Sequence, residues 1–438
     1  MRLWPTGGLW RHPDFVKLWS AQTVSQFGTQ FTQLALPLVA IDVVHASAFE
    51  VAALTAVEFL PFLLVSLPAG VWVDRLRRRP ILVVGDASRA VLLASVPVAY
   101  WSGSVTMAQL YIVGFLVGIA TVFFDVAYQS YLPSLVQRQQ LIDGNAKLEI
   151  SRAGAQLGGP GLAGLVIDFL KAPTAIAFDA VSFIGSALFI FGIRKQERTE
   201  PARPQRRMRA ELREGLRYVL THPFLKNIAA CTALFNFFGS LGFAVLLVFA
   251  RRELHLSPLA IGLALTLANI GALLAAFNAS RISSRFGVGR TIIGAAIVGG
   301  PMFLVIPFAP EGNAALALLI PAFTIGGLAN VIYNVTQVSL RQAITPERIQ
   351  GRMNAVMRFI VWGTIPLGAL IGGVLASKIG VKETLIVGGI GSCLPFLPVL
   401  LSPVRSVQEM PEPIDEAAAV LEPLVADAAP VPAEHLGT

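Results

Sequence analysis

Residues 70–80 read Gly-Val-Trp-Val-Asp-Arg-Leu-Arg-Arg-Arg-Pro and stand between two long apolar runs, at 51–73 and 81–101. Four of these eleven residues are arginine and one is aspartate. A short basic segment between two apolar runs is typical of a cytoplasmic loop in a membrane protein, because Lys and Arg gather on that side. The stretch therefore predicts a chain embedded in a membrane and gives one of its loops an orientation.

The composition agrees with a chain that lies mostly inside a membrane. Of the 438 residues, 55% are hydrophobic and 14% are charged, whereas a soluble domain carries about 25% charged residues. Twelve membrane-spanning helices of about 20 residues each would use about 240 residues, which is close to the apolar total. A soluble enzyme does not fit, and basic loops explain the net charge of +8 better than nucleic-acid binding does.

Several kinds of site have no support in the sequence. Cys231 and Cys393 both lie in apolar runs, so neither a disulfide framework nor a cysteine-ligated zinc site is indicated. There is no Gly-Lys dipeptide, which excludes a Walker A nucleotide-binding loop. We expect no cofactor, no bound metal, no nucleotide and no nucleic-acid partner.

Twelve apolar runs are long enough to cross a bilayer, and lipid offers no partners for free backbone groups, so each run should be a helix. The runs fall at 15–44, 51–73, 81–101, 107–131, 150–170, 173–193, 224–250, 257–280, 291–309, 313–340, 353–377 and 382–402. This model leaves 28 of the 34 Lys and Arg residues on one side. The opposite side receives only Lys171, Arg251, Arg252, Lys378 and Lys382. The basic side is expected to be cytoplasmic and to carry both termini.

The spans divide six and six around a long basic interruption. We expect an N-terminal six-helix bundle at 1–193, a cytoplasmic linker at 194–222, a C-terminal six-helix bundle at 223–403 and a disordered acidic tail at 404–438. Linker residues 212–220 carry apolar side chains at helical spacing, which fits a helix on the membrane surface or a solvated helix equally well. His12-Pro13 recurs as His222-Pro223, and Asn145-Ala146 recurs as Asn354-Ala355. The bundles are therefore parallel repeats, with a pathway expected between them.

The basic loop carries a resemblance to a known family. A glycine, three residues, Asp-Arg and then basic residues resemble the signature loop of major facilitator superfamily transporters, although Arg77 stands where that pattern has a second glycine. The resemblance implies an all-α membrane fold of twelve helices in two six-helix bundles related by pseudo-two-fold symmetry. It also implies a cytoplasmic gate, with the start of the eleventh span, near Arg358, as the candidate partner of its aspartate; a simple basic anchor is the alternative. The gating residues would be Gly70, Asp74, Arg75, Arg78 and Arg79.

The fifth span is rich in glycine around a proline. It contains Gly158, Gly159, Pro160, Gly161 and Gly164, which resembles the Gly-Pro motif of the superfamily's antiporters and favours export. Small residues at this spacing also permit close helix packing, so packing alone is the other interpretation.

Polar residues recur at helical spacing in four of the spans. They are Gln22, Gln26, Thr29 and Gln33; Thr121, Asp125 and Tyr128; Thr232, Asn236 and Ser240; and Asn330, Asn334, Gln337 and Arg341. These are spans one, four, seven and ten, which line the central cavity in the family that the chain resembles. Hydrogen bonds between helices would also explain an individual residue.

Two carboxylates inside spans are candidates for proton coupling. Glu58 lies about seven residues into its span, well away from both ends, and a charge there is costly and usually functional. It could bind a proton or a cationic substrate, or it could make a structural hydrogen bond. Asp125 is the second candidate, whereas Asp86 and Arg89 are three residues apart and are expected to pair within one helix.

The segment from Phe123 to Pro133, followed by Asn145-Ala146, resembles the macrolide-efflux and enterobactin-exporter branch. The resemblance implies a monomeric exporter in the bacterial inner membrane, coupled to protons, that moves a small amphipathic molecule by alternating access. Its partners would be that molecule, protons and the lipid bilayer, and it would not be an enzyme. An importer of a small polar metabolite and a membrane scaffold that transports nothing are the alternatives.

Overall fold

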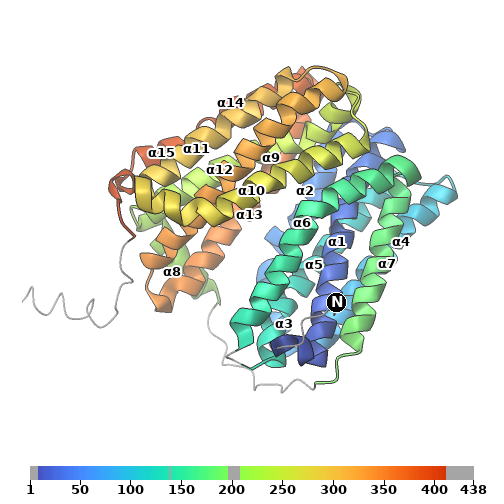
Figure 1. Cartoon of the computed structure of the whole chain (residues 1–438), viewed down its shortest axis with the longest axis horizontal. Helices are drawn as coiled ribbons and strands as arrows, with labels where there is room; N and C mark the ends of the chain where they lie inside the picture. The colour runs from blue at the N-terminus through green and yellow to red at the C-terminus, as the bar shows by residue number, and fades with distance from the viewer. Residues whose placement is uncertain (1–7, 138–139, 196–207, 411–438) are drawn as a thin grey trace, which may run out of the picture.

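The computed structural model describes residues 8–137, 140–195 and 208–410, and this part of the chain is helical with short connections and no strand (Figure 1). The first half comprises η1 (Gly8–Arg11), α1 (Pro13–Asp42), α2 (Ala48–Leu64), α3 (Ser66–Arg75), α4 (Arg78–Trp101), α5 (Met107–Leu135), α6 (Leu141–Leu170) and α7 (Ala172–Phe191). A linker helix follows, α8 (Met208–Thr221). The second half comprises α9 (Leu225–Arg252), α10 (Pro258–Phe286), α11 (Val288–Val305), η3 (Ile306–Phe308), η4 (Gly312–Ala315), α12 (Leu316–Ala343), α13 (Glu347–Ile379), α14 (Val381–Ser392), α15 (Phe396–Leu400) and η5 (Pro403–Ser406).

Helices occupy all twelve predicted ranges, but they do not all have the composition of a simple lipid-facing span. Within the described residues, nine helical segments are long and apolar enough to cross a membrane. The three ranges outside that set are α1, α2 with α3, and α6. Both α1 and α6 have 30 residues, so their polar side chains rather than their length set them apart. The range at 51–73 is interrupted at Val65, which leaves α2 with 17 residues.

Two bundles make up the molecule. In the first, α1 packs on α6 and α7, and α4 packs on α5 and α7; in the second, α9 packs on α13 and α14, and α12 packs on α10 and α11. The bundles touch through α2 with α13 and through α6 with α10. Figure 1 shows them meeting at one end, here called the far end, and diverging toward the linker end, where α3, α8 and the N terminus lie.

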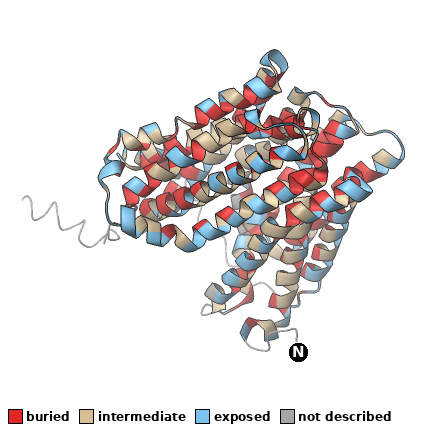
Figure 2. Ribbon diagram, turned by 45° about the horizontal axis from the view of Figure 1, so that its top comes forward, coloured by how far each residue is buried: buried red, intermediate tan, exposed pale blue. Residues whose placement is uncertain are grey.

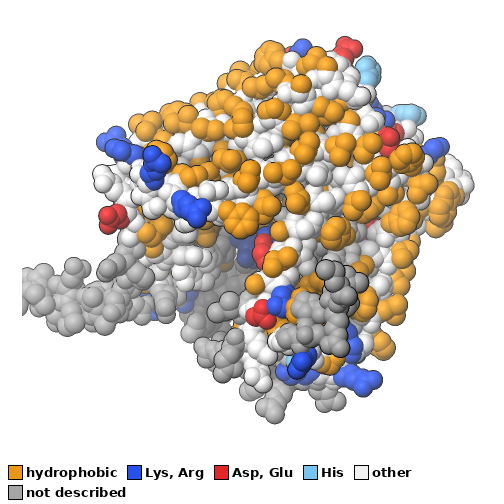
Figure 3. Space-filling view, viewed as in Figure 1, with side chains coloured by type: hydrophobic (Ala, Val, Ile, Leu, Met, Phe, Trp, Pro, Cys, Tyr) orange, Lys and Arg blue, Asp and Glu red, His pale blue; other side chains and the backbone are white. Residues whose placement is uncertain are grey.

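The outer surface is suited to lipid. Buried residues gather inside each bundle, and exposed residues lie on the outer helix faces (Figure 2). Many exposed side chains are large and apolar, among them Val91, Phe169, Phe277 and Leu401. Figure 3 shows hydrophobic side chains spread over the visible face and most of its Lys and Arg near the ends.

The backbone repeats between the two halves. The Nδ1 atom of His12 accepts a hydrogen bond from the backbone N–H of Phe15, and that of His222 accepts one from Phe224. At the far end, His45 and His255 both adopt left-handed backbone conformations, with φ of 57° and 53°. The same hydrogen bonds surround both histidines at an offset of 210 residues. The predicted repeat therefore extends to individual turns.

The linker helix and the start of the tail are attached to the second half. Glu214 of α8 pairs with Arg348 and Arg352 of α13, at 3.4 and 2.5 Å, and Val219 is completely buried. One face of this helix therefore packs on α13, while Leu216 and Leu220 remain exposed on the other. The backbone N–H groups of Val288 and Gly289 bond to carbonyls of residues 408 and 407, so ordered chain extends beyond the expected tail boundary at 404. Residues 411–438 lie outside the described part of the chain.

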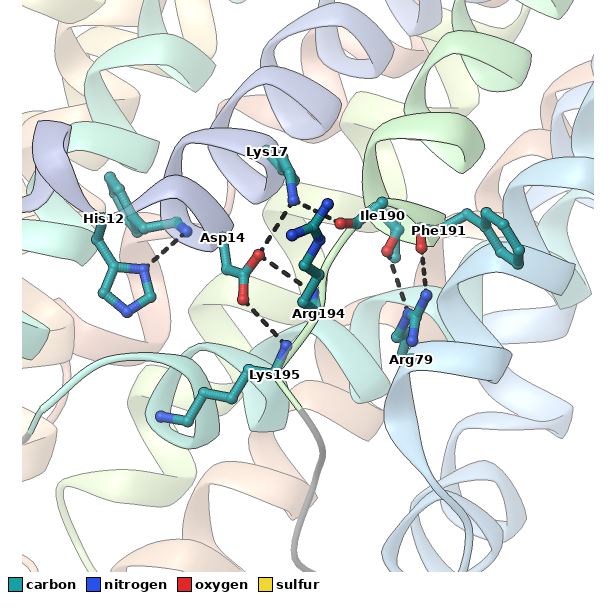
Figure 4. A network of polar contacts seen from close by, with 10 residues as sticks. His12, Asp14, Lys17, Arg79, Ile190, Phe191, Arg194 and Lys195 are labelled. Carbon is teal, nitrogen blue, oxygen red and sulfur yellow. Dashed lines mark hydrogen bonds and ion pairs between the residues drawn. The ribbon is translucent and has the colours of Figure 1, made fainter.

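A polar network joins α1 to the end of α7 at the linker end (Figure 4). The carboxylate of Asp14 accepts hydrogen bonds from the backbone N–H groups of Arg194 and Lys195, at 3.1 and 3.0 Å, and from Lys17 Nζ at 3.2 Å. Burial alone would raise the pKa of Asp14, but these donors outweigh it and hold the pKa below its ordinary value of 3.8. The ionised carboxylate therefore stabilises the folded protein.

Replacing Asp14 with Ala should lower the free energy of unfolding by about 1–2 kcal/mol, because two backbone donors lose their acceptor. Thermal unfolding of the detergent-purified protein measures this. The contribution of Asp14 to the free energy of unfolding is present above about pH 4 and is lost as the pH falls through its lowered pKa. The difference in unfolding temperature between the parent and D14A should therefore disappear at acidic pH. Asp143→Asn, which removes an exposed acid on α6, is the control. Equal unfolding temperatures for D14A and the parent at neutral pH would contradict the assignment.

Candidate functional site

A cavity of about 700 Å³ lies between the two bundles. The first half contributes α1, α2 and α6, and the second contributes α9, α10, α11, η3, α12, α13 and α14. Its polar lining residues are Gln30, Gln33, Thr55, Glu58, Asn236, Ser240, Asn269, Asn330 and Ser392. Its aromatic lining residues are Phe59, Phe235, Phe243, Phe303 and Phe323. The cavity is therefore mainly apolar and aromatic, with amide and hydroxyl groups from both halves.

Glu58 is the charged residue in this lining, and no lysine or arginine lines the cavity with it among the described residues. Gly114 of α5 makes room for its side chain, since a Cβ atom there would lie 3.1 Å from Glu58 Cγ. No ion pair joins Glu58 to another described residue. An unpaired carboxylate in apolar surroundings is costly unless a proton or a cation neutralises it. The cavity can therefore bind positive charge at this one place.

A second pocket, of about 420 Å³, lies within the first half. It is lined by Gln22 and Gln26 of α1, Tyr128 of α5, and a polar stretch of α6 that includes Asn145, Glu149, Ser151 and Arg152. The polar stripes predicted from the sequence are thus divided between two places. Gln33, Asn236 and Asn330 line the central cavity, whereas Gln22, Gln26 and Tyr128 line the second pocket.

The remaining stripe residues bond mainly along their own helices. Thr29 donates its hydroxyl to the Ser25 carbonyl at 2.8 Å. On α12, Asn334 donates to the Asn330 side chain at 2.8 Å, and Gln337 donates to Asn334 at 3.5 Å. These residues extend a line of amides away from the cavity without lining it.

Buried charges inside the first half form a separate cluster. Arg89 is ion-paired with Asp86 on the same helix, which confirms the predicted pair. The guanidinium lies between the rings of Phe124 and Phe183, at 4.3 and 4.2 Å from their centroids. Ser186 donates a hydrogen bond to Asp86 at 2.6 Å. Asp125 lines neither pocket; it is exposed on α5, one residue after the Phe124 ring.

The predicted gating residues lie around the connection between α3 and α4. Gly70, Asp74 and Arg75 belong to α3, and their side chains lie outside what the structure describes. Arg78 begins α4. Arg79 donates hydrogen bonds to the Ile190 carbonyl, at 3.3 Å, and to the Phe191 carbonyl (Figure 4). It therefore supplies donors to the carbonyls at the end of α7, in its own half.

The glycine-rich stretch of α6 is a close contact between the halves. A Cβ atom on Gly164 would lie 2.5 Å from the Pro258 carbonyl oxygen, and one on Gly262 of α10 would lie 2.3 Å from that of Pro160. Gly159 faces α1 instead, where a Cβ atom would lie 2.4 Å from Gln30 Cγ. Neither side of this contact has room for larger residues.

Two hydrogen bonds join the halves beside Pro160, and the proline explains the first of them. Proline has no N–H, so the carbonyl of Gln156, four residues earlier, loses its helical partner. Asn269 of α10 donates to that carbonyl at 2.6 Å, and the N–H of Gly161 donates to Thr266 Oγ1 at 2.9 Å. Neither Asn269 nor Thr266 was predicted from the sequence, although an isolated asparagine in an apolar run is a recognisable signal.

The comparisons with known proteins agree with this arrangement. The family model described as transmembrane secretion effector, a major facilitator superfamily model, matches residues 8–430. The multidrug efflux pump Tap of Mycolicibacterium fortuitum is 28% identical over 389 residues, which cover 86% of this chain and 92% of that protein.

Solved structures show the same fold at low identity. A bacterial homologue of the iron transporter ferroportin, in its inward-facing state, has a TM-score of 0.72 and 19% identity, with 90% of this chain and 99% of that chain covered. An outward-facing structure of a bacterial ferroportin homologue has a TM-score of 0.57 and 17% identity, with 89% and 98% covered. From its two helical bundles, its central cavity and the family match, the chain belongs to the transmembrane secretion effector family of major facilitator superfamily transporters.

Proposed function

We propose that this protein exports a small amphipathic molecule by proton-coupled alternating access. The observation that carries the proposal is Glu58, a carboxylate without a basic partner in a cavity lined by both bundles. When such a group exchanges a bound proton for a substrate, it links proton movement to substrate movement. The efflux activity named for the Tap relative supports export as the direction.

The lining favours neutral or cationic compounds with aromatic or aliphatic surface. Five phenylalanine rings offer apolar contact and can face a cation, and the amides of Gln33, Asn236 and Asn330 can orient polar groups. An anionic substrate would meet Glu58 without a compensating base. A drug-like, macrolide-type or siderophore-type molecule in an uncharged or cationic form fits this chemistry.

We assign the linker end to the cytoplasm of a bacterial cell, because most Lys and Arg residues lie on that side of the twelve-span model. With this orientation the structure is inward-facing: the bundles meet at the outer end and diverge at the inner end. The higher TM-score against the inward-facing ferroportin homologue supports this assignment. Residues 1–193 and 223–403 would rock against each other around the cavity.

The cytoplasmic gate is assigned to the end of α3. Asp74 and Arg75 would meet α13 near Arg358, in its cytoplasmic part, when the inner end closes. Asp125, exposed on α5 toward the linker end, remains the second candidate for proton binding. In this scheme Arg79 does not act in the gate. It donates a hydrogen bond to the Ile190 carbonyl and so holds the end of α7 within its own half.

Replacing Glu58 with Gln should uncouple transport from the proton gradient. Everted vesicles with an acidic interior should accumulate ethidium, a planar aromatic cation, and E58Q should reduce this accumulation about tenfold or more. Exchange of ethidium without a gradient should persist in the variant. Fluorescence of the dye measures both.

The matched control is Glu50→Gln, on the same helix but outside the cavity. Its carboxylate bonds to the backbone N–H of Ser47 in a capping box, a role that glutamine also fills. Gradient dependence that is the same in E58Q and E50Q would remove Glu58 from the mechanism. A parent protein that does not move ethidium would remove lipophilic cations from the substrate class.

Replacing Asn269 with Ala should weaken the contact between the halves, because the Gln156 carbonyl would then lack a partner inside the membrane. Leaving a carbonyl without a hydrogen-bond partner where no water can replace it costs about 1–3 kcal/mol, so the unfolding temperature of N269A should fall by several degrees. Asn278→Ala is the control, since Asn278 lies on the same helix, is half-buried and donates its side-chain hydrogen bond to the Leu274 carbonyl within α10. If the two variants unfold at the same temperature, the hydrogen bond between the halves has no energetic role.

A further inference from the structure

Two equivalent loops face each other at the far end of the molecule. One joins α1 to α2 and the other joins α9 to α10, and each contains a histidine in the left-handed conformation. Asp42 ends α1, and Arg251 and Arg252 end α9, so the two loops bring opposite charges together from opposite halves. None of these residues lines the central cavity.

The contacts between the loops are direct. Arg251 Nε lies 3.3 and 3.2 Å from the two carboxylate oxygens of Asp42, and a terminal nitrogen of Arg251 lies 3.1 Å from one of them. The other terminal nitrogen of Arg251 donates to the Leu256 carbonyl at 2.6 Å. Arg252 donates to the Ala46 carbonyl, also at 2.6 Å. We call Asp42, Arg251 and Arg252, with these two carbonyls, the far-end clamp.

The clamp uses the repeat but is not symmetric. The Ala46 and Leu256 carbonyls are 210 residues apart and occupy equivalent places in their loops. At the same offset, Arg251 and Arg252 correspond to Ile41 and Asp42. One half therefore supplies both arginines, and one of these equivalent positions has an acid in one half and a base in the other.

The position of these arginines is unusual. In the twelve-span model only five basic residues lie on the far side, where Lys and Arg are disfavoured, and two of the five are adjacent here. The side chains of Arg251 and Asp42 are 24% and 35% exposed. A partly exposed ion pair of this kind is weak and is screened by salt, so it can form and break within a transport cycle.

We propose that Asp42, Arg251 and Arg252 form the gate that holds the far end shut in this state and separates when that end opens. The inference rests on the proposed alternating access, because only a protein that opens at both ends needs such a gate. Asp42 belongs to the first bundle and Arg251 to the second, so their ion pair must break when the two loops separate.

Distances between spin labels can test the gate without any substrate. The labels go on Ser104→Cys and Asn313→Cys, two exposed far-end positions in opposite halves, with Cys231 and Cys393 replaced by Ala. The parent should show a population at short distance. Arg251→Gln with Arg252→Gln should raise the ratio of long-distance to short-distance molecules about tenfold.

A change of salt concentration and a matched control variant test whether the charges of the clamp control these distances. Raising the salt from about 0.01 M to about 1 M shortens the screening length from about 30 Å to about 3 Å, which should lengthen the distances in the parent more than in the double variant. Lys382→Gln, an exposed far-end base outside the clamp, should leave the distribution unchanged. An unchanged distribution in the R251Q and R252Q double variant would overturn the gate, as would an equal shift in K382Q.

The two proposals can fail separately. Equal gradient dependence in E58Q and E50Q would count against the proposed proton coupling, while the label distances would still report whether the clamp controls opening. A lower unfolding temperature with unchanged distances would show that the residues only stabilise the fold, which also overturns the gate.

Discussion

A carbonyl group inside a lipid-embedded helix must find its hydrogen-bond partner within the protein, because the surrounding solvent has none to offer. Regular helix meets this requirement everywhere except at a proline. At Pro160 the freed carbonyl of Gln156 is satisfied by Asn269, which belongs to the other half. The requirement that makes each span a helix therefore also joins the two bundles, at a place where glycines on both sides let the backbones approach.

The absence of water also matters for Glu58, because the membrane interior cannot solvate an ionised carboxylate. A carboxylate on a soluble surface needs no explanation, but one in a cavity lined by phenylalanine and aliphatic side chains must be neutralised. Arg89 does this for Asp86 inside the first bundle, where both side chains are almost completely buried. Glu58 has no such base beside it, and it lies where the two bundles meet. In the proposed mechanism a mobile partner, either a proton or a substrate, balances its charge.

Much of the fold followed from residue patterns, because lipid imposes a simple rule on each span. The twelve apolar ranges and the repeat of His12 at His222 were readable in this way, since length, hydropathy and spacing decide them. The break in the second span at Val65 was not, because it depends on local backbone geometry.

The site was only partly readable, for a related reason. Periodicity shows which face of a helix avoids lipid, but it does not show how far along the helix a pocket extends. Gln33 lines the central cavity and Gln26 the second pocket, although both belong to one stripe. Gln30 and Thr55 were not predicted, although Gln30 lies four residues after Gln26 and Thr55 lies three residues before Glu58, spacings that place each pair on one helix face. Asn269 was not predicted because its acceptor is the Gln156 carbonyl. That carbonyl is recognised as free only when the missing N–H of Pro160, four residues later, is taken into account.

The repeat leaves one difference between the halves that bears on mechanism. Among the described residues, the buried charged side chains are Asp14, Asp86, Arg89 and Asp179, and all four belong to the first half. The buried polar side chains of the second half are uncharged, for example Thr232, Gln337 and Ser392. The cavity lining shows the same difference. Its acidic residue, Glu58, comes from the first half, whereas the second half contributes the uncharged side chains of Asn236 and Asn330. If both halves descend from one design, the groups that can hold a proton have been kept in one of them. Proton binding would then change the charge of the first bundle alone, and a rocking motion of one bundle against the other is a direct way to respond to that change.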